Sequence, residues 1–173
     1  MVTRPLLLAA AAVLLSLGIF ASRAEEAGLK PQIRALVAEI NAALPRYLRE
    51  TRSMEGLSLE GSEAVFFSEG GALKKITVKL YGETYNGAAE LYYQGADVAF
   101  VYRKLNRYDT QVGMQPPPKV VSTQEARLYF SGGALAALRI GQQDIADSDI
   151  QWREAEEEIA ELASQLETEF RKR

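Results

Sequence analysis

The sequence predicts an α+β fold with an N-terminal helix, an antiparallel β-meander of about six to seven strands and a C-terminal amphipathic helix. Three observations support this fold class. Apolar residues recur at helical spacing over residues 31–44, alternate with polar residues between glycine turns over residues 46–140, and return to helical spacing over residues 149–173. At least one helix is expected to cover the apolar face of the sheet, and sandwich-like closure is the main alternative.

The chain opens with the features of a secretory signal peptide. Arg4 precedes an apolar run from Leu6 to Phe20, and the small-x-small segment Ser22–Ala24 follows it. Removal of residues 1–24 would leave a single α+β domain over residues 25–173. The run is shorter than the roughly 20 apolar residues that cross a membrane, so we expect no stable membrane span after cleavage. These features predict a periplasmic or secreted protein, with a domain tethered by an uncleaved leader as the alternative.

The amino-acid composition excludes several functional classes. The chain has no cysteine and no histidine, so it cannot form disulfides, build the usual zinc sites or activate a nucleophile through histidine. Asp and Glu number 23 against 20 Lys and Arg, and the resulting net charge of −3 disfavours binding to nucleic acid. The sequence therefore predicts no metal site, no cofactor and no nucleic-acid partner.

The first predicted helix, residues 31–44, carries one apolar stripe. Its members are Ile33, Leu36, Val37, Ile40 and Leu44. Pro31 suits a first-turn position, and the helix is expected to stop before Pro45, because the residue preceding a proline avoids the helical conformation.

Seven segments of the predicted sheet have the alternating pattern of half-buried strands. The clearest is Leu73–Tyr81, with Ile76, Val78 and Leu80 on one face and Thr77, Lys79 and Tyr81 on the other. In Asp97–Leu105, Val98, Phe100 and Tyr102 alternate with Ala99, Val101 and Arg103. The remaining strands are expected at Arg46–Arg52, Ser62–Phe67, Gly87–Tyr93, Thr123–Phe130 and Leu135–Ile140.

Three of these strand pairs share a weak internal repeat. The segments Phe66–Leu73, Tyr92–Val98 and Tyr129–Leu135 each combine an aromatic pair, a glycine turn and a returning apolar strand. Gly71 and Gly133 are expected in hairpin turns, where glycine can adopt positive φ without a Cβ clash. The middle copy has Gly-Ala-Asp in place of Gly-Gly-Ala, which indicates a register one residue different from the others.

The repeated hairpins resemble those of small uncharacterised exported bacterial proteins, and they are more weakly similar to MORN-like hairpin repeats. The similarity extends through Leu80–Thr84, Phe100–Tyr102 and the closing charged helix, and covers roughly residue 44 to the C-terminus. The resemblance implies a meander fold, and it carries no known activity or site residue.

The last part of the chain contains one long loop and a second amphipathic helix. The connection from Asn106 to Ser122 includes Pro116–Pro118, which cannot donate to a sheet ladder. Ser148 or Asp149 is expected to cap the helix over residues 149–173. Its apolar stripe consists of Trp152, Ile159, Leu162, Leu166 and Phe170.

Tyrosines are concentrated in the predicted sheet, and this concentration defines the candidate site. Seven of the 8 tyrosines lie between Tyr81 and Tyr129, close to several cations. The candidate ligand-binding residues are Tyr81, Tyr93, Tyr102, Arg103, Arg107 and Tyr129. Together on one exposed face they would suit a sugar, a peptide or an anionic polymer. Cross-strand aromatic packing without any ligand is the alternative.

The sequence contains no assembled catalytic motif, and it leaves open whether the chain has any activity. We expect a non-catalytic exported binding or protein-interaction module whose partner is an unknown protein or envelope polymer. A carboxylate-based envelope enzyme is one alternative, using two of the residues Glu83, Glu90, Asp97 and Asp109. A structural envelope protein tethered by an uncleaved leader is the other.

Overall fold

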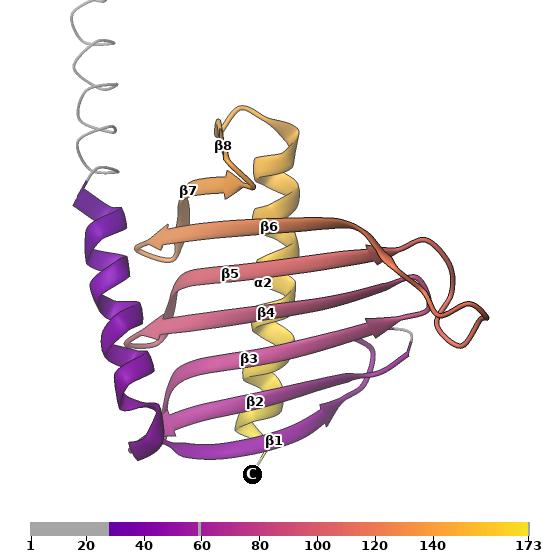
Figure 1. Cartoon of the computed structure of the whole chain (residues 1–173). Coiled ribbons are helices and arrows are strands. Elements are labelled where there is room, and N and C mark those ends of the chain that lie inside the picture. The colour runs from indigo at the N-terminus through magenta and orange to yellow at the C-terminus, as the bar shows by residue number, and fades with distance from the viewer. Residues whose placement is uncertain (1–27, 59, 173) are drawn as a thin grey trace, which may run out of the picture.

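The computed structural model describes residues 28–58 and 60–172, so the expected signal peptide lies outside the described residues. An N-terminal helix (residues 28–43) and the 3₁₀ turn η1 (Leu44–Arg46) lead into an antiparallel sheet, and the helix α2 (Ile150–Arg171) follows it (Figure 1). The strands are β1 (Leu48–Met54), β2 (Ser62–Glu69), β3 (Ala72–Gly82), β4 (Tyr85–Gln94), β5 (Asp97–Tyr108), β6 (Val120–Ser131), β7 (Ala134–Ile140) and β8 (Gln143–Ile145). The predicted α+β fold is confirmed.

The sheet has eight strands rather than the predicted six to seven. The strand that the sequence did not predict is β8, which is three residues long and pairs only with β7. A strand this short offers too little alternation to be distinguished from a loop. The strands follow one another in space in the order β1 to β8, and every neighbouring pair is antiparallel.

Within the described residues, the helix ends differ only slightly from the predicted ones. The N-terminal helix already includes residues 28–30, because Leu29 extends its apolar stripe, and it ends at residue 43, before Pro45. Asp149 is the N-cap of α2, and its side chain accepts a hydrogen bond from the backbone N–H of Gln151. Within the described residues, no helix is long and apolar enough to cross a membrane.

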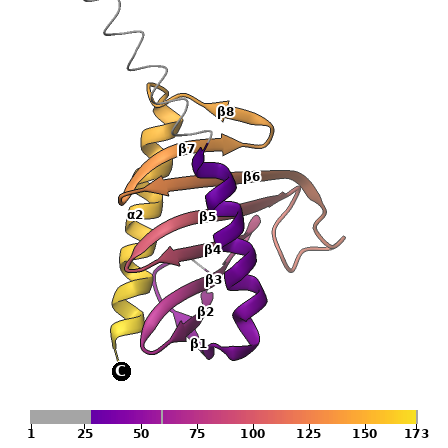
Figure 2. The ribbon, with the colours of Figure 1, turned by 90° about the vertical axis from the view of Figure 1, so that its left-hand side faces the viewer.

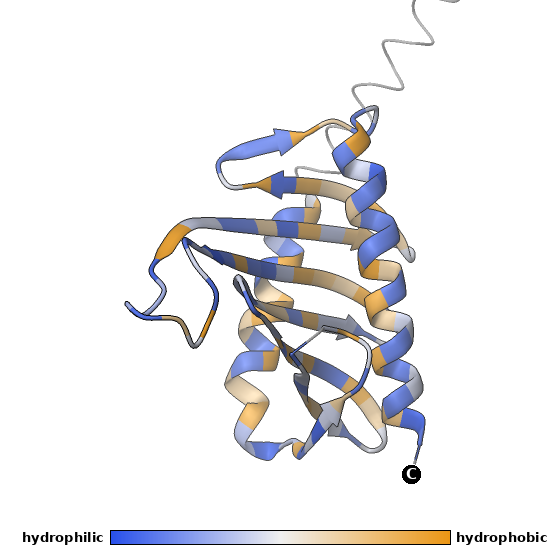
Figure 3. Cartoon of the chain, turned by 90° about the vertical axis from the view of Figure 1, so that its right-hand side faces the viewer, coloured by the Kyte–Doolittle hydropathy of each residue, from blue (hydrophilic) through white to orange (hydrophobic). Residues whose placement is uncertain are grey.

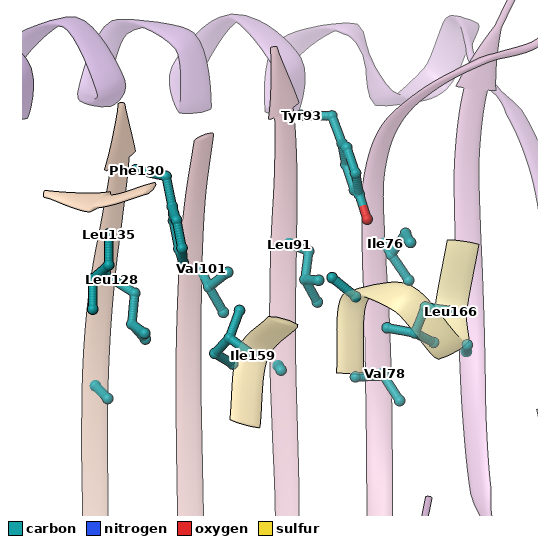
Figure 4. Packing of buried hydrophobic residues seen from close by; sticks show 14 of the residues in the cluster. Ile76, Val78, Leu91, Tyr93, Val101, Leu128, Phe130, Leu135, Ile159 and Leu166 are labelled. Carbon is teal, nitrogen blue, oxygen red and sulfur yellow. The ribbon is translucent and has the colours of Figure 1, made fainter. Parts of the chain in front are cut away.

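The two helices pack on opposite faces of the sheet and run across its strands (Figure 2). The α2 face carries the larger core, in which Ile159 and Leu166 of α2 meet strand residues such as Leu91 (Figure 4). The N-terminal helix covers a smaller cluster on the other face, where Ile33 and Ile40 pack on an aromatic row. That row consists of Tyr92, Phe100 and Tyr129 on β4, β5 and β6.

Three β-hairpins share one geometry at the end of the sheet beneath the N-terminal helix. Gly70 and Gly71 have φ of 59° and 83°, and Gly132 and Gly133 have φ of 58° and 82°, as a type I′ turn requires. Each returning strand contains one extra residue, and the register shifts lie at Phe67/Ser68, Tyr92/Tyr93 and Tyr129/Phe130. The middle hairpin therefore has the same register as the other two, and the expected one-residue difference is wrong.

The extra residue in each hairpin changes which side chains share a face. In β5, Ala99 is the extra residue, so Val98 packs in the α2 core while Phe100 packs under the N-terminal helix. The prediction that Val98 and Phe100 share a face is therefore wrong. Beyond the bulges the strands alternate regularly between polar and apolar residues (Figure 3).

Candidate functional site

Polar and aromatic strand residues gather on the sheet face opposite α2, called here the open face. The N-terminal helix covers one end of it, and the loop of residues 109–119 projects on the same side at the other end (Figures 2 and 3). Between them, Lys79, Tyr81 and Ala88 are exposed. Tyr81 retains 42% of its surface, more than any other tyrosine among the described residues.

The inner end of the open face holds a buried polar cluster around Lys75, of which only 6% is exposed. Its ammonium lies 2.7 Å from Oε2 of Glu90 and donates to the hydroxyl of Tyr92 at 2.8 Å and to Oδ1 of Asn41 at 3.0 Å. An ammonium has three donors, and these three partners occupy them all. Because Asn41 belongs to the N-terminal helix, the cluster ties that helix to the sheet.

The same cluster shifts the pKa of both acidic groups. Burial alone would raise the pKa of Glu90, but hydrogen bonds from Lys75 and Tyr92 outweigh it and hold the pKa below its ordinary value. Burial and the Glu90 carboxylate raise the pKa of Tyr92, whose hydroxyl donates to Oε2 of Glu90 at 2.5 Å. Glu90 is therefore stabilised as a carboxylate, and Tyr92 as a neutral phenol.

A second cluster occupies the middle of the open face. The guanidinium of Arg127 lies over the ring of Tyr102, 5.3 Å from its centroid, and 3.0 Å from Oε2 of Glu125. The Tyr102 hydroxyl and Arg127 both lower the pKa of Glu125. Tyr102, Glu125 and Arg127 thus interact with one another and are partly buried. They lie beside the exposed part of the open face.

Amide and hydroxyl groups form a cross-strand ladder at the outer end of the open face. The side chain of Asn106 on β5 donates to Oδ1 of Asn86 on β4 at 2.8 Å, and Thr123 on β6 donates to Oδ1 of Asn106 at 2.8 Å. Tyr81 on β3 lies directly opposite Asn86 in the register. The row thus presents an exposed aromatic ring next to a line of oriented polar groups.

Two lysines lie on either side of Ala88, between the amide ladder and the cluster of Tyr102, Glu125 and Arg127. Lys79 is opposite Ala88, and Ala88 is opposite Lys104. The Cα atoms of the two lysines are about 10 Å apart, twice the spacing between strands. Among the described residues, neither lysine forms an ion pair. Each member of this lysine pair, Lys79 and Lys104, instead faces a glutamate on the neighbouring strand. Lys79 lies opposite Glu63, and Lys104 lies opposite Glu125, whose pKa it helps to lower.

The predicted site residues lie on both faces of the sheet. Tyr81 and Tyr102 share the open face, and Tyr129 lies on the same face but packs in the cluster under the N-terminal helix. Tyr93 is buried in the α2 core, where burial and the Glu167 carboxylate raise its pKa. Figure 4 shows its ring among the core side chains.

The two predicted arginines also lie away from the tyrosines of the open face. Arg103 forms an ion pair with Glu158 of α2. Arg107 is exposed, and strand alternation puts it on the same side as Arg103. Lys104 was not predicted, although the alternation of β5 places it on the face of Tyr102. The amide ladder was not predicted either.

The four candidate carboxylates are held separately. Glu90 bonds to Lys75 and Tyr92, Glu83 accepts from Gln111 at 2.9 Å, and Asp109 accepts from the backbone N–H of Lys119 at 2.8 Å. Asp97 is exposed at the start of β5. No two of the four are joined by a shared contact within the described residues.

A hollow of about 650 Å³ lies on the other side of the molecule, between the end of β1 and the last turns of α2. Met54 of β1 and the α2 residues Ser164 and Thr168 contribute to its walls. None of the predicted site residues lines it.

Comparisons of the chain with protein-family models, with curated proteins and with solved structures find no match. The physical properties of the open face are therefore the basis for a functional proposal.

Proposed function

We propose that this chain is a non-catalytic binding module that holds an acidic polysaccharide on its open face. The observation that carries the proposal is the lysine pair, two cations on either side of Ala88 that form no close ion pair among the described residues. Carboxylates or phosphates spaced along a polymer would pair with Lys79 and Lys104 in competition with the facing Glu63 and Glu125 carboxylates.

The residues beside the lysine pair favour an acidic sugar over anions that are not sugars. The exposed ring of Tyr81 offers an apolar surface on which a sugar ring can stack. Asn86, Asn106 and Thr123 are held in place by their hydrogen bonds, so they present donors and acceptors to hydroxyl groups in fixed directions. Polymer binding also suits a face that is long and open.

The test is titration of polygalacturonate, an acidic polysaccharide, into the full chain and into a Lys79→Ala/Lys104→Ala variant. We expect the double variant to bind at least about tenfold more weakly, a loss of about 1.4 kcal/mol. Binding should also weaken as salt concentration rises, because exposed charges are screened. Dextran, a neutral polysaccharide, should bind far more weakly than polygalacturonate.

The matched control is Lys74→Ala/Lys172→Ala, which removes the same charge from sites outside the open face. Lys74 is the extra residue of the β2–β3 hairpin, and Lys172 is the C-cap of α2. Equal loss of binding in both double variants would show that net charge alone attracts the polymer, and the proposed site would be wrong.

A further inference from the structure

The outer edge of β1 has the features of a self-complementary pairing surface. β1 pairs with β2 over all seven of its residues with no register shift, and its other edge is the end of the sheet. It contains no proline and no bulge, two devices that usually protect an edge strand from further pairing. At the opposite edge, β8 is only three residues long.

The order of side chains along β1 is symmetric in its chemistry about Thr51. An antiparallel pair formed by two copies around Thr51 would set Glu50 of each copy opposite Arg52 of the other. Opposite charges in directly facing positions stabilise an antiparallel pair, and facing threonines do the same. Glu50 and Arg52 already lie 2.7 Å apart within one chain, and Arg52 also lies 3.7 Å from Glu169 of α2, so pairing would join these charges in one cluster.

The ends of the strand add an apolar contact. Leu48 is 57% exposed, which is high for a leucine in a strand, and the same symmetry would set it opposite Met54 of the second copy. Met54 lies at the wall of the hollow between β1 and α2. Leu48 of each copy would therefore be covered beside the hollow of the other copy, while Met54 is already buried in its own core.

We propose that the chain forms a two-fold symmetric dimer in which the β1 strands of two copies pair antiparallel around Thr51 and join the two sheets into one. The arrangement is isologous, because the same edge serves both copies and closes the assembly at two. The proposal does not rest on a ligand of the open face, since β2 separates β1 from β3, the nearest strand of the lysine pair.

The absence of cysteine from the chain makes a direct test possible. The full chain carrying Thr51→Cys is purified under reducing conditions and then oxidised with copper phenanthroline. Facing residues of an antiparallel pair have Cβ atoms about 4.5–5.5 Å apart, close enough for a disulfide after a small adjustment. We expect a covalent dimer, seen as a band of twice the chain's mass on a non-reducing gel.

Ser53→Cys is the matched control, because Ser53 is exposed on the same strand and the same face as Thr51. In the proposed dimer the two copies of residue 53 are displaced by about 13 Å along the strand, beyond the reach of a disulfide. Equal cross-linking of the two variants would indicate random collision. A monomer in both would also overturn the proposal.

A charge variant gives a second measurement on the same edge. Glu50→Arg would face Arg52 of the other copy with a like charge, so the dimer fraction in sedimentation should fall. Glu63→Arg, an exposed change on β2, should leave the dimer fraction unchanged. Circular dichroism establishes that both variants are folded. Retention of the dimer by Glu50→Arg would contradict the proposed pairing.

Discussion

At the scale of single residues, the lysines of the open face differ in how many of their donors are already used. Lys75 is buried and bonded to Glu90, Tyr92 and Asn41, so it holds the N-terminal helix in place and has no donor left for a ligand. Lys79 and Lys104 have the same charge but form no close ion pair among the described residues, and each faces a glutamate, Glu63 or Glu125. Chemical identity alone does not distinguish a buried structural lysine from a more accessible one.

The lowered pKa of Glu90 predicts a specific sensitivity to acid. Its carboxylate is stabilised more in the folded than in the unfolded chain. Its contribution to stability is therefore complete above the ordinary pKa of 4.5 and is lost as the pH falls through the lower folded value. We expect the melting temperature of Glu90→Gln to fall less than that of the unmodified chain between about pH 6 and about pH 3.

The control for this measurement is Glu157→Gln, which neutralises an exposed carboxylate on α2. It should show the same pH dependence as the unmodified chain. If Glu90→Gln loses stability on acidification as steeply as the unmodified chain and Glu157→Gln do, the Lys75 cluster does not contribute to the acid sensitivity.

The tyrosines of the two faces should respond differently to truncation. Tyr81 is 42% exposed, so Tyr81→Ala should change the free energy of unfolding by less than about 0.5 kcal/mol. Tyr93 is 2% exposed in the α2 core, so Tyr93→Ala should cost about 3–5 kcal/mol. Urea unfolding curves of the two variants measure both values. A large loss in Tyr81→Ala would assign that ring to packing.

Part of the candidate site could be predicted from the sequence, and part could not. The strand alternation alone indicates that Lys104, and not Arg103, shares a face with Tyr102. The Lys75 cluster could not be predicted, because it needs Asn41, which is 34 residues away and belongs to another element. A contact of that kind depends on how the N-terminal helix lies on the sheet.

At the scale of elements, the three bulged hairpins determine which face each strand residue occupies. The single extra residue after each turn sends Leu73, Val98 and Leu135 into the α2 core. The two aromatic residues before a turn then pack on opposite faces of the sheet. Tyr92 lies under the N-terminal helix, and Tyr93 lies in the α2 core.

The glycine turns should be sensitive to side chains for reasons of backbone conformation. Gly71 and Gly133 have φ of 83° and 82°, and no atom lies within 4 Å of a Cβ placed on either. Valine at either position should therefore destabilise the fold by about 1 kcal/mol or more through strain alone. Asparagine, which tolerates positive φ, should cost less. Equal melting temperatures for valine and glycine would contradict the turn geometry.

The sequence pattern predicted the helices and the long strands but not the details that depend on pairing. The stripe of α2 and the alternation of β3 are strong because each repeats over several turns or residue pairs. The bulge at Ala99 leaves no clear trace in the sequence, because an extra alanine looks the same in either register. The polar strand β8 is defined only by its pairing with β7.

At the scale of the whole molecule, the sheet is covered unequally by its two helices. α2 buries the extended core that runs from Met54 on β1 to Ile145 on β8, whereas the N-terminal helix covers the shorter aromatic row. The unequal burial predicts that the two layers differ in stability.

Paired core variants should measure this difference. Leu166 is 0% exposed in α2, so Leu166→Ala should lower the global free energy of unfolding by about 2–5 kcal/mol. Ile40 is 3% exposed in the N-terminal helix, and Ile40→Ala should accelerate hydrogen exchange mainly in residues 28–43. Uniform acceleration across the sheet in Ile40→Ala would show that both layers unfold as one unit.

The order of the strands also has a consequence for how the chain folds as it is made. Each strand pairs with its neighbour in sequence, so hairpins can form in succession from the N-terminus with short loops to close. The contacts of α2 are distant, since Arg52 meets the backbone of Glu169 across 117 residues. The helix that covers the main apolar face is therefore synthesised after all eight strands. Until it docks, that face is exposed on a nascent sheet, and it is the surface on which a holdase chaperone would act.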